Sequence, residues 1–309
     1  MSLNRIRSTI INSLWQSYLA TTPVVQKIVT VLSAQQIPIP PLDHFAIIDL
    51  PSEHTGIKVL REIFECLQFE YKGSGYLPDK QNGFVWLCEW DAATKLPQYV
   101  LPQVVVADFN LYELPPHIVK IVSNYASLAA PFPFNEFDGL LARLESDETA
   151  EPLLIKLIED YFSGRAWAMP TCHEIEQVKK VNELLAWVLV FGRRPNHFTF
   201  AMHLNKHFPH FDQFLDWVEH ELAIPLNHQG GRIKGHAESG IQQAATHLPP
   251  EPIQLADGTI HLSAPFVEFV WRYPILPTLK PTRFADYFTD FIAVNANNVV
   301  ESLYDKERT

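Results

Sequence analysis

The stretch Asn196-His197-Phe198-Thr199-Phe200-Ala201-Met202-His203 reads as a β-strand with two unlike faces. Because side chains alternate across a strand, the odd-numbered residues from His197 to His203 share one face. Phe198, Phe200 and Met202 lie on the other face and are large and apolar, which suits a packed core. The opposite face is small and polar, which suits the lining of a ligand cavity, although a half-exposed strand with its polar face in water explains the same pattern.

Two further strand-like segments carry a metal-ligating side chain among apolar neighbours. They are Asp43-His44-Phe45-Ala46-Ile47-Ile48 and Phe266-Val267-Glu268-Phe269-Val270-Trp271. An ionised carboxylate inside an apolar strand is costly unless a cation or hydrogen-bond donors meet it. Two imidazoles and one carboxylate, arriving from three separate strands, form the facial triad that suits non-haem Fe(II). The sequence therefore predicts a divalent metal site at His44, His197 and Glu268, with Fe(II) first and Zn, Ni or Mn also accepted by these donors.

Each of these residues also has a plainer interpretation. A single histidine such as His44 is often a core or edge residue with satisfied hydrogen bonds, and Glu268 could pair with Arg272 on the same strand face. Four strand residues separate those two Cα atoms by about 13 Å, too far for a direct pair without bending. The histidines at 203–210 have a helix-compatible spacing, but Pro209 predicts a loop there. Residues 219–221 lie on a predicted helix with side chains that point in different directions, so both segments are interpreted as surface features.

The order of predicted elements repeats along the chain. Apolar spacing predicts helices over 8–34, broken at Thr21-Thr22-Pro23, and a mainly helical segment over about 113–190. A strand, a helix and three strands precede that segment, and a second set in the same order follows it. The later strands are expected at about 196–203, 232–235, 252–262 and 265–272, with a hairpin signal at Ala256-Asp257-Gly258-Thr259.

This order predicts an α+β fold in which two βαβββ modules form a half-barrel around a metal, the vicinal-oxygen-chelate architecture. We expect a single domain over residues 1–309, with a helical N-terminus and a helical insert. Its parts are N-terminal helices (1–36), a first module (42–110), the insert (111–190), a second module (194–275) and a C-terminal segment (276–309).

The composition excludes several classes of function. Of the 309 residues, 47% are hydrophobic, enough for a large core, and the net charge of −11 with no basic patch argues against a nucleic-acid partner. Three widely spaced cysteines form no disulfide framework, and no apolar run is long enough for a membrane span. With no signal peptide pattern at the N-terminus, these features predict a cytoplasmic protein. The oligomeric state does not follow from them.

Other catalytic motifs find little support. The glycine-rich stretch Gly230-Gly231-Arg232-Ile233-Lys234-Gly235 lacks the spacing of a phosphate-binding loop and reads as a turn entering a strand. Lys234 remains a candidate contact for an anion. No GxSxG elbow occurs, so a hydrolase with a covalent intermediate is not favoured.

At these segments the chain resembles the DUF1338 family, whose characterised bacterial members are 2-oxoadipate dioxygenase/decarboxylases, also called 2-hydroxyglutarate synthases. The resemblance covers residues 10 to 305. It is carried by Leu42-Asp43-His44-Phe45-Ala46, Tyr76-Leu77-Pro78-Asp79-Lys80, Ala186-Trp187-Val188-Leu189, Asn196-His197-Phe198-Thr199, the stretch 230–235, Val267-Glu268-Phe269 and Asn295-Ala296 leading to Glu301-Ser302.

The resemblance implies a modified vicinal-oxygen-chelate fold with His44, His197 and Glu268 as iron ligands. The family reaction takes a 2-oxo acid and O2, releases CO2 and returns a hydroxylated acid that is one carbon shorter. Two departures from the family concern the substrate. Ile48 stands where the family carries an arginine that grips the substrate carboxylate, and the family's Gln-Ser-Ser-Thr run reads Gln243-Ala244-Ala245-Thr246. We therefore expect a different or less anionic substrate, or lost activity.

The sequence leads to one main hypothesis and two alternatives. The main hypothesis is an Fe(II)-dependent dioxygenase acting on a small 2-oxo acid and O2, with Lys234, Gln243 and Arg272 as substrate-binding candidates, because cationic side chains meet carboxylates. One alternative is a non-catalytic protein that binds a metal or a small molecule. The other is a glyoxalase-type lyase or isomerase that uses Zn, Ni or Mn.

Overall fold

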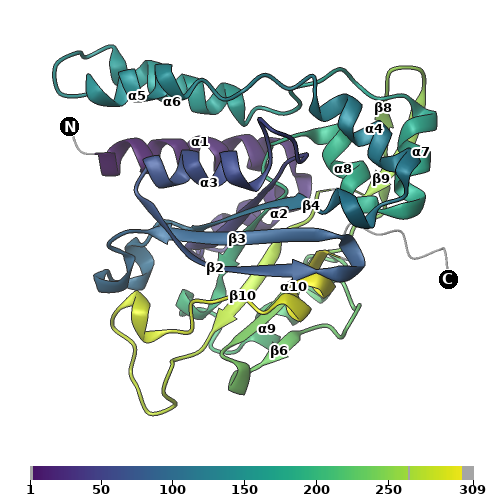
Figure 1. Cartoon of the computed structure of the whole chain (residues 1–309). Helices are drawn as coiled ribbons and strands as arrows, with labels where there is room; N and C mark the ends of the chain where they lie inside the picture. Colours follow the sequence, from purple (N-terminus) through teal and green to yellow (C-terminus); the bar gives the residue numbers. More distant parts are fainter. Residues whose placement is uncertain (1–2, 264, 301–309) are drawn as a thin grey trace.

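The computed structural model describes residues 3–263 and 265–300, and a sheet of eight strands forms its centre (Figure 1). The strands lie in the order β2-β3-β4-β1-β5-β10-β7-β6. Their bounds are Leu42–Ile48 (β1), Phe69–Leu77 (β2), Asn82–Glu89 (β3), Gln103–Phe109 (β4), His197–Ala201 (β5), Lys234–His236 (β6), Ile241–Ala245 (β7) and Glu268–Arg272 (β10).

The sheet consists of two βαβββ modules with the same internal order. The first is β1-α3-β2-β3-β4, with α3 at Ile57–Cys66, and the second is β5-α9-β6-β7-β10, with α9 at Phe211–Asp216. In each module the first strand runs parallel to the last strand, and antiparallel pairing between β1 and β5 joins the modules. The predicted α+β fold with two such modules is confirmed.

One strand of the second module was placed wrongly from the sequence. The segment expected as a module strand at 252–262 instead forms a separate hairpin, β8 (Pro250–Gln254) with β9 (Thr259–Ser263). The true module strand is β7, which pairs with both β6 and β10. Its sequence, Ile241-Gln242-Gln243-Ala244-Ala245, has few β-branched or aromatic residues, so it carries a weak strand signal.

The strand predicted at 196–203 is also shorter than expected. It ends at Ala201, and residues Met202–Leu204 form a single 3₁₀ turn. His203 therefore leaves the face that it was expected to share with His197.

Helices surround the sheet in two groups. The N-terminal pair is α1 (Leu3–Thr21) and α2 (Pro23–Ala34), which meet at the predicted break, where Pro23 begins the second helix. The helical insert follows the first module, as predicted. Its helices are α4 (Pro116–Ala126), α5 (Phe134–Ala142), α6 (Ala150–Tyr161), α7 (Cys172–Val181) and α8 (Glu183–Phe191).

The two faces of the central strands have different surroundings. Phe45 and Phe198 point toward the N-terminal helices, where Trp15 and Tyr18 of α1 pack on Phe198 with ring centroids 5.3 and 5.2 Å apart. Figure 1 shows α1 and α3 on this side of the sheet, with α5 and α6 beyond them. The other face carries the polar side chains, so the apolar and polar faces predicted from strand periodicity are confirmed for residues 197–201.

The last helix, α10 (Ala293–Val300), connects the two ends of the sheet. It contacts β2, the edge strand of the first module, and both β6 and β7 of the second module. A single helix can contact both edges only if the sheet curls, so the eight strands form a half-barrel with α10 across its open side.

Two further findings concern the cysteines and the lengths of the helices. Cys66, Cys88 and Cys172 are free thiols, as the sequence predicted. Among the helices of residues 3–263 and 265–300, none is both long enough and apolar enough to span a membrane.

An acid on β4, next to the start of α3, makes stability depend on pH. Asp108 accepts a hydrogen bond from the backbone N–H of Ile57, and burial together with the nearby Asp49 raises the pKa of Asp108 to about 6. Above pH 4 the unfolded chain loses this proton while the folded chain keeps it, so the contribution of Asp108 to stability falls as the pH rises to about 6.

We expect Asp108→Asn to remove the loss of stability that Asp108 causes as the pH rises. The variant keeps an acceptor for the Ile57 N–H, and its stability relative to the wild type should increase by roughly 3 kcal/mol between pH 4 and pH 7. Urea unfolding at four pH values measures the difference. A difference that stays constant over this range would contradict the prediction.

Candidate metal centre

Three neighbouring strands at the centre of the sheet bring the candidate ligands together. In the β1–β5 pairing His44 lies opposite Thr199, and in the β5–β10 pairing Glu268 lies opposite the same Thr199. His197 is two residues from Thr199 and therefore on the same face. Strand register alone thus places all three side chains on the polar face of the sheet, where the two modules meet.

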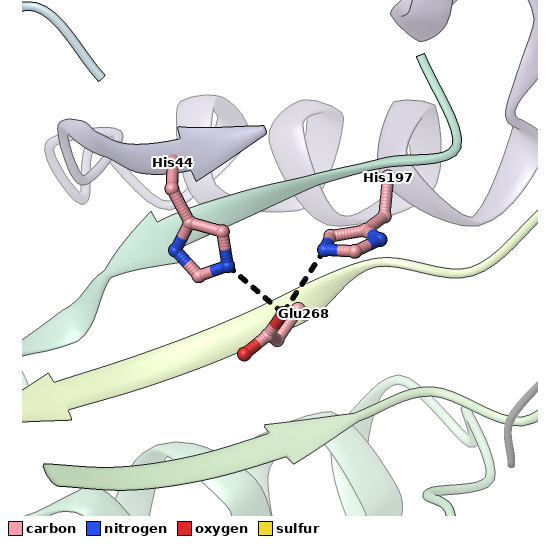
Figure 2. A group of neighbouring side chains, drawn as sticks. All are labelled: His44, His197 and Glu268. Carbon is pink, nitrogen blue, oxygen red and sulfur yellow. Dashed lines mark hydrogen bonds and ion pairs between the residues drawn. The ribbon is translucent and has the colours of Figure 1, made fainter. Parts of the chain in front are cut away.

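The side chains converge on a small space (Figure 2). Oε2 of Glu268 is 3.2 Å from Nε2 of His44 and 3.2 Å from Nε2 of His197, and the ligand atoms of the three residues all lie within 4.8 Å of one another. They form the one group of this kind within residues 3–263 and 265–300. All three residues are at least 93% buried, so water does not solvate the charge of Glu268.

Each imidazole is held by the residue that precedes it in the sequence. Nδ1 of His44 bonds to Oδ1 of Asp43 at 2.7 Å, and Nδ1 of His197 bonds to Oδ1 of Asn196 at 2.9 Å. An acceptor on Nδ1 places the proton of the neutral ring there and leaves the Nε2 lone pair free for a cation. Both Nε2 atoms face Glu268, so the donor set fits a divalent metal ion.

The carboxylate of Glu268 is oriented by two more side chains. Nε2 of Gln243 donates to Oε1 at 2.6 Å, and the hydroxyl of Thr199 donates to Oε2 at 3.1 Å. Gln243 therefore fixes one oxygen while the other faces the two imidazoles. Predicted as a substrate-binding residue, Gln243 lies in direct contact with a candidate ligand.

The cluster has a strong attraction for positive charge. Burial disfavours the charged form of His44, but the carboxylate of Glu268 overcomes it and raises the pKa of His44 to about 9. Burial would likewise raise the pKa of Glu268, but His44 and His197 hold it well below its ordinary value. The three side chains therefore favour a positive charge between them, which a divalent metal ion would supply.

A buried ion pair supports His44 from behind. Arg272 grips Asp43 with two hydrogen bonds, from Nε at 2.8 Å and from Nη2 at 2.9 Å, and both side chains are almost fully buried. Burial would raise the pKa of Asp43, but the Arg272 guanidinium and His44 lower it far below its ordinary range. Nη1 of Arg272 donates to the backbone carbonyls of Phe288 and Asp290, each at 3.0 Å.

A cavity opens beside the cluster on the polar face of the sheet. Besides the three candidate ligands it is lined by the amides of Asn82, Asn196 and Gln243. Apolar residues supply the rest of its described wall, namely Ala46, Ile48, Leu77, Phe84, Val105, Ala107, Leu184, Phe291, Ala296, Val299 and Val300. Strands of both modules, the helical insert and α10 all contribute, so the complete fold is needed to form the cavity.

The other two substrate-binding candidates lie outside this described lining. Lys234 is buried, and its Nζ donates to the carbonyl of Asn227 at 2.5 Å. Arg272 uses its guanidinium on Asp43 and on backbone carbonyls, as described above. A role for either residue in binding substrate stays a prediction, and the geometry gives Arg272 a supporting position behind His44.

Sequence reasoning missed two residues of this site, Asn196 and Asp43. From the sequence, each was considered only as part of a strand-like segment, with no role at the site. The signal that could have found them is a short side chain with an oxygen acceptor immediately before each candidate histidine, as in Asp43-His44 and Asn196-His197.

The chain is similar to known proteins in sequence and in structure. No protein-family model matches the chain. The chain is 34% identical over 148 residues to the 2-oxoadipate dioxygenase/decarboxylase, chloroplastic, of Arabidopsis thaliana; the match covers 46% of this chain and only 39% of that relative. It is 24% identical over 277 residues to the chloroplastic/amyloplastic enzyme of that name from rice, over 88% of this chain and 70% of the relative.

Solved structures share the fold. The hydroxyglutarate synthase of Oryza sativa in complex with 2-oxoadipate superposes with a TM-score of 0.78 at 22% identity, over 97% of this chain and 93% of that one. The Shigella flexneri protein YdcJ, which includes domain DUF1338, has a TM-score of 0.67 at 13% identity over 98% and 93%. A putative glyoxalase superfamily protein of Ralstonia eutropha has a TM-score of 0.72 at 17% identity over 88% and 84%. The resemblance found in the sequence is thereby confirmed.

Proposed function

We propose that this chain is a non-haem Fe(II)-dependent oxygenase that acts on a small 2-oxo acid and O2. The observation that carries the proposal is the convergence of two Nε2 atoms and one carboxylate oxygen from three adjacent strands, with each imidazole oriented by an acceptor on Nδ1. The relatives named 2-oxoadipate dioxygenase/decarboxylase support the substrate class.

The residues of the site would have separate roles. His44, His197 and Glu268 would hold the metal on one side and leave the side toward the cavity for the reactants. Bound Fe(II) would supply Lewis acidity toward the 2-oxo acid and electrons toward O2. Asp43 and Asn196 keep the rings in place, and Gln243 keeps the carboxylate turned toward them. The apolar wall of the cavity excludes water from the reacting groups.

The overall reaction that we propose is balanced. One molecule of 2-oxo acid and one of O2 give one CO2 and a hydroxylated acid that is one carbon shorter, so both oxygen atoms of O2 are accounted for in the products. We place the reaction in the cytoplasm, where the three free thiols would stay reduced.

Oxygen uptake tests the proposal. Protein loaded with Fe(II) under nitrogen is mixed with air-saturated buffer and a panel of 2-oxo acids, and we expect O2 consumption and CO2 release in a one-to-one ratio with at least one of them. Protein loaded with Zn(II) should consume no O2, because zinc has no accessible redox change.

Two outcomes would contradict the proposal. If no acid on the panel supports uptake, the reaction class loses its support and a non-catalytic binding protein becomes the better account. If elemental analysis of the protein as isolated finds Zn, Ni or Mn and the Fe(II) form is inert, a glyoxalase-type lyase or isomerase is favoured, because the same donors accept those ions.

A further inference from the structure

We propose that the cavity selects 2-oxo acids whose side chain is uncharged and apolar, and rejects dicarboxylic 2-oxo acids of the same length. This inference rests on the proposed function, because it assumes that the 2-oxo acid end of the substrate lies at the metal cluster. It follows from which side chains line the cavity away from that cluster.

The described wall of the cavity beyond the candidate ligands contains no cationic side chain. It is built from aliphatic and aromatic residues such as Ile48, Phe84 and Val300, together with three neutral amides. A carboxylate buried among such groups without a cation or several donors loses its hydration and gains nothing comparable. The far end of the cavity therefore favours a hydrocarbon chain.

Two of the three amides already use one of their two N–H donors within the protein, so few donors remain for a second carboxylate. Nδ2 of Asn82 donates to the carbonyl of Asp108 at 2.8 Å, and Nε2 of Gln243 donates to Glu268. Nδ2 of Asn196 is buried and has no hydrogen-bond partner among residues 3–263 and 265–300, but Asn196 directly precedes His197. Its free donor is therefore placed at the cluster end of the cavity, where the polar end of the substrate would lie.

The buried cation behind His44 is already neutralised. Arg272 forms its two hydrogen bonds to Asp43 and two more to backbone carbonyls. The net charge of the metal cluster also disfavours a second carboxylate. A divalent ion, the Glu268 carboxylate and two neutral imidazoles together carry a charge of +1. One carboxylate of a 2-oxo acid balances that charge, and a second carboxylate would stay uncompensated.

Position 48 is where this selectivity can be changed. Ile48 is on β1, on the same strand face as His44, and lies about 13 Å further along the strand. It is 4% exposed and lines the cavity. An arginine there would bring a cation to the part of the wall that now lacks one.

Matched pairs of ligands test the inference by binding rather than by turnover. The pairs are 2-oxohexanoate with 2-oxoadipate and 2-oxopentanoate with 2-oxoglutarate, in which a terminal methyl group replaces a carboxylate at equal chain length. Isothermal titration of the metal-loaded protein under nitrogen should give at least ten-fold tighter binding of the monocarboxylate in each pair. Ile48→Arg should reduce or reverse this ratio, whereas Ile48→Met, which is also unbranched and flexible but uncharged, should preserve it.

The outcomes separate this inference from the proposed function. Tighter binding of the dicarboxylates by the wild-type protein overturns the inference and leaves the proposed function standing. If the metal-loaded protein binds neither member of either pair, the proposed function fails and the inference fails with it. The wild-type measurement decides both points even if Ile48→Arg does not fold.

Discussion

Glu268→Gln is expected to abolish stoichiometric metal binding while the chain stays folded. The substitution keeps the shape of the side chain and its hydrogen bond with Gln243, but it removes the negative charge that faces the Nε2 atoms of His44 and His197. Losing only an outer hydrogen-bond partner of a metal ligand costs about 10–100-fold in affinity, so losing a ligand charge should cost more.

Metal content after dialysis measures this effect, with circular dichroism as the check on folding. His197→Ala should give the same loss. The matched control is His203→Ala. His203 is in the 3₁₀ turn that follows the same strand, its ring packs against Tyr287 with centroids 4.8 Å apart, and it is outside the cluster. If Glu268→Gln and His197→Ala both retain one equivalent of metal, these residues are not the ligands.

Arg272→Met should destabilise the protein by about 3–5 kcal/mol, because it leaves the Asp43 carboxylate buried without its cation. Asp43 is 7% exposed, and Arg272 supplies two of its hydrogen bonds. The same substitution releases the carbonyls of Phe288 and Asp290. Chemical denaturation of the metal-free protein measures the change without interference from the ligand set.

A double substitution tests the cause of this destabilisation. In Asp43→Asn/Arg272→Met the uncompensated charge is gone, so the double variant should lose less stability than the two single variants together. Lys156→Met is the surface control, because its partner Asp160 lies four residues away on the exposed side of α6, and its expected cost is below about 0.5 kcal/mol. Additive losses in the double variant would show that Asp43 and Arg272 stabilise the chain independently.

Much of the fold could be predicted because its local patterns agree with its tertiary structure. The break at Thr22-Pro23, the first module and the helical insert have strong helix or strand signals, and the structure confirms them. The second module was harder, because β7 is rich in glutamine and alanine while the hairpin at 250–263 has the stronger strand pattern. Pairing with β6 and β10 decides that β7 is a strand, and such long-range pairing leaves no local signal.

In the candidate site, too, local sequence patterns predicted some residues and missed others that depend on long-range contacts. His44, His197 and Glu268 could be chosen from the sequence because each interrupts an apolar strand. The pairing of Asp43 with Arg272 could not be predicted, because the two residues are 229 positions apart and meet only through the order of strands in the sheet. The extent of the domain and the roles of Lys234 and Arg272 toward a substrate stay predictions.

The position of α10 has a consequence for how the protein is made. This helix comes last among the described elements, yet it contacts the edge strands of both modules and supplies Ala296, Val299 and Val300 to the cavity wall. During synthesis the N-terminal part of the chain emerges from the ribosome first, so the central strands are available before α10 is. We therefore expect the three strands that carry His44, His197 and Glu268 to associate first around an open cavity, which closes only after residues 293–300 have emerged.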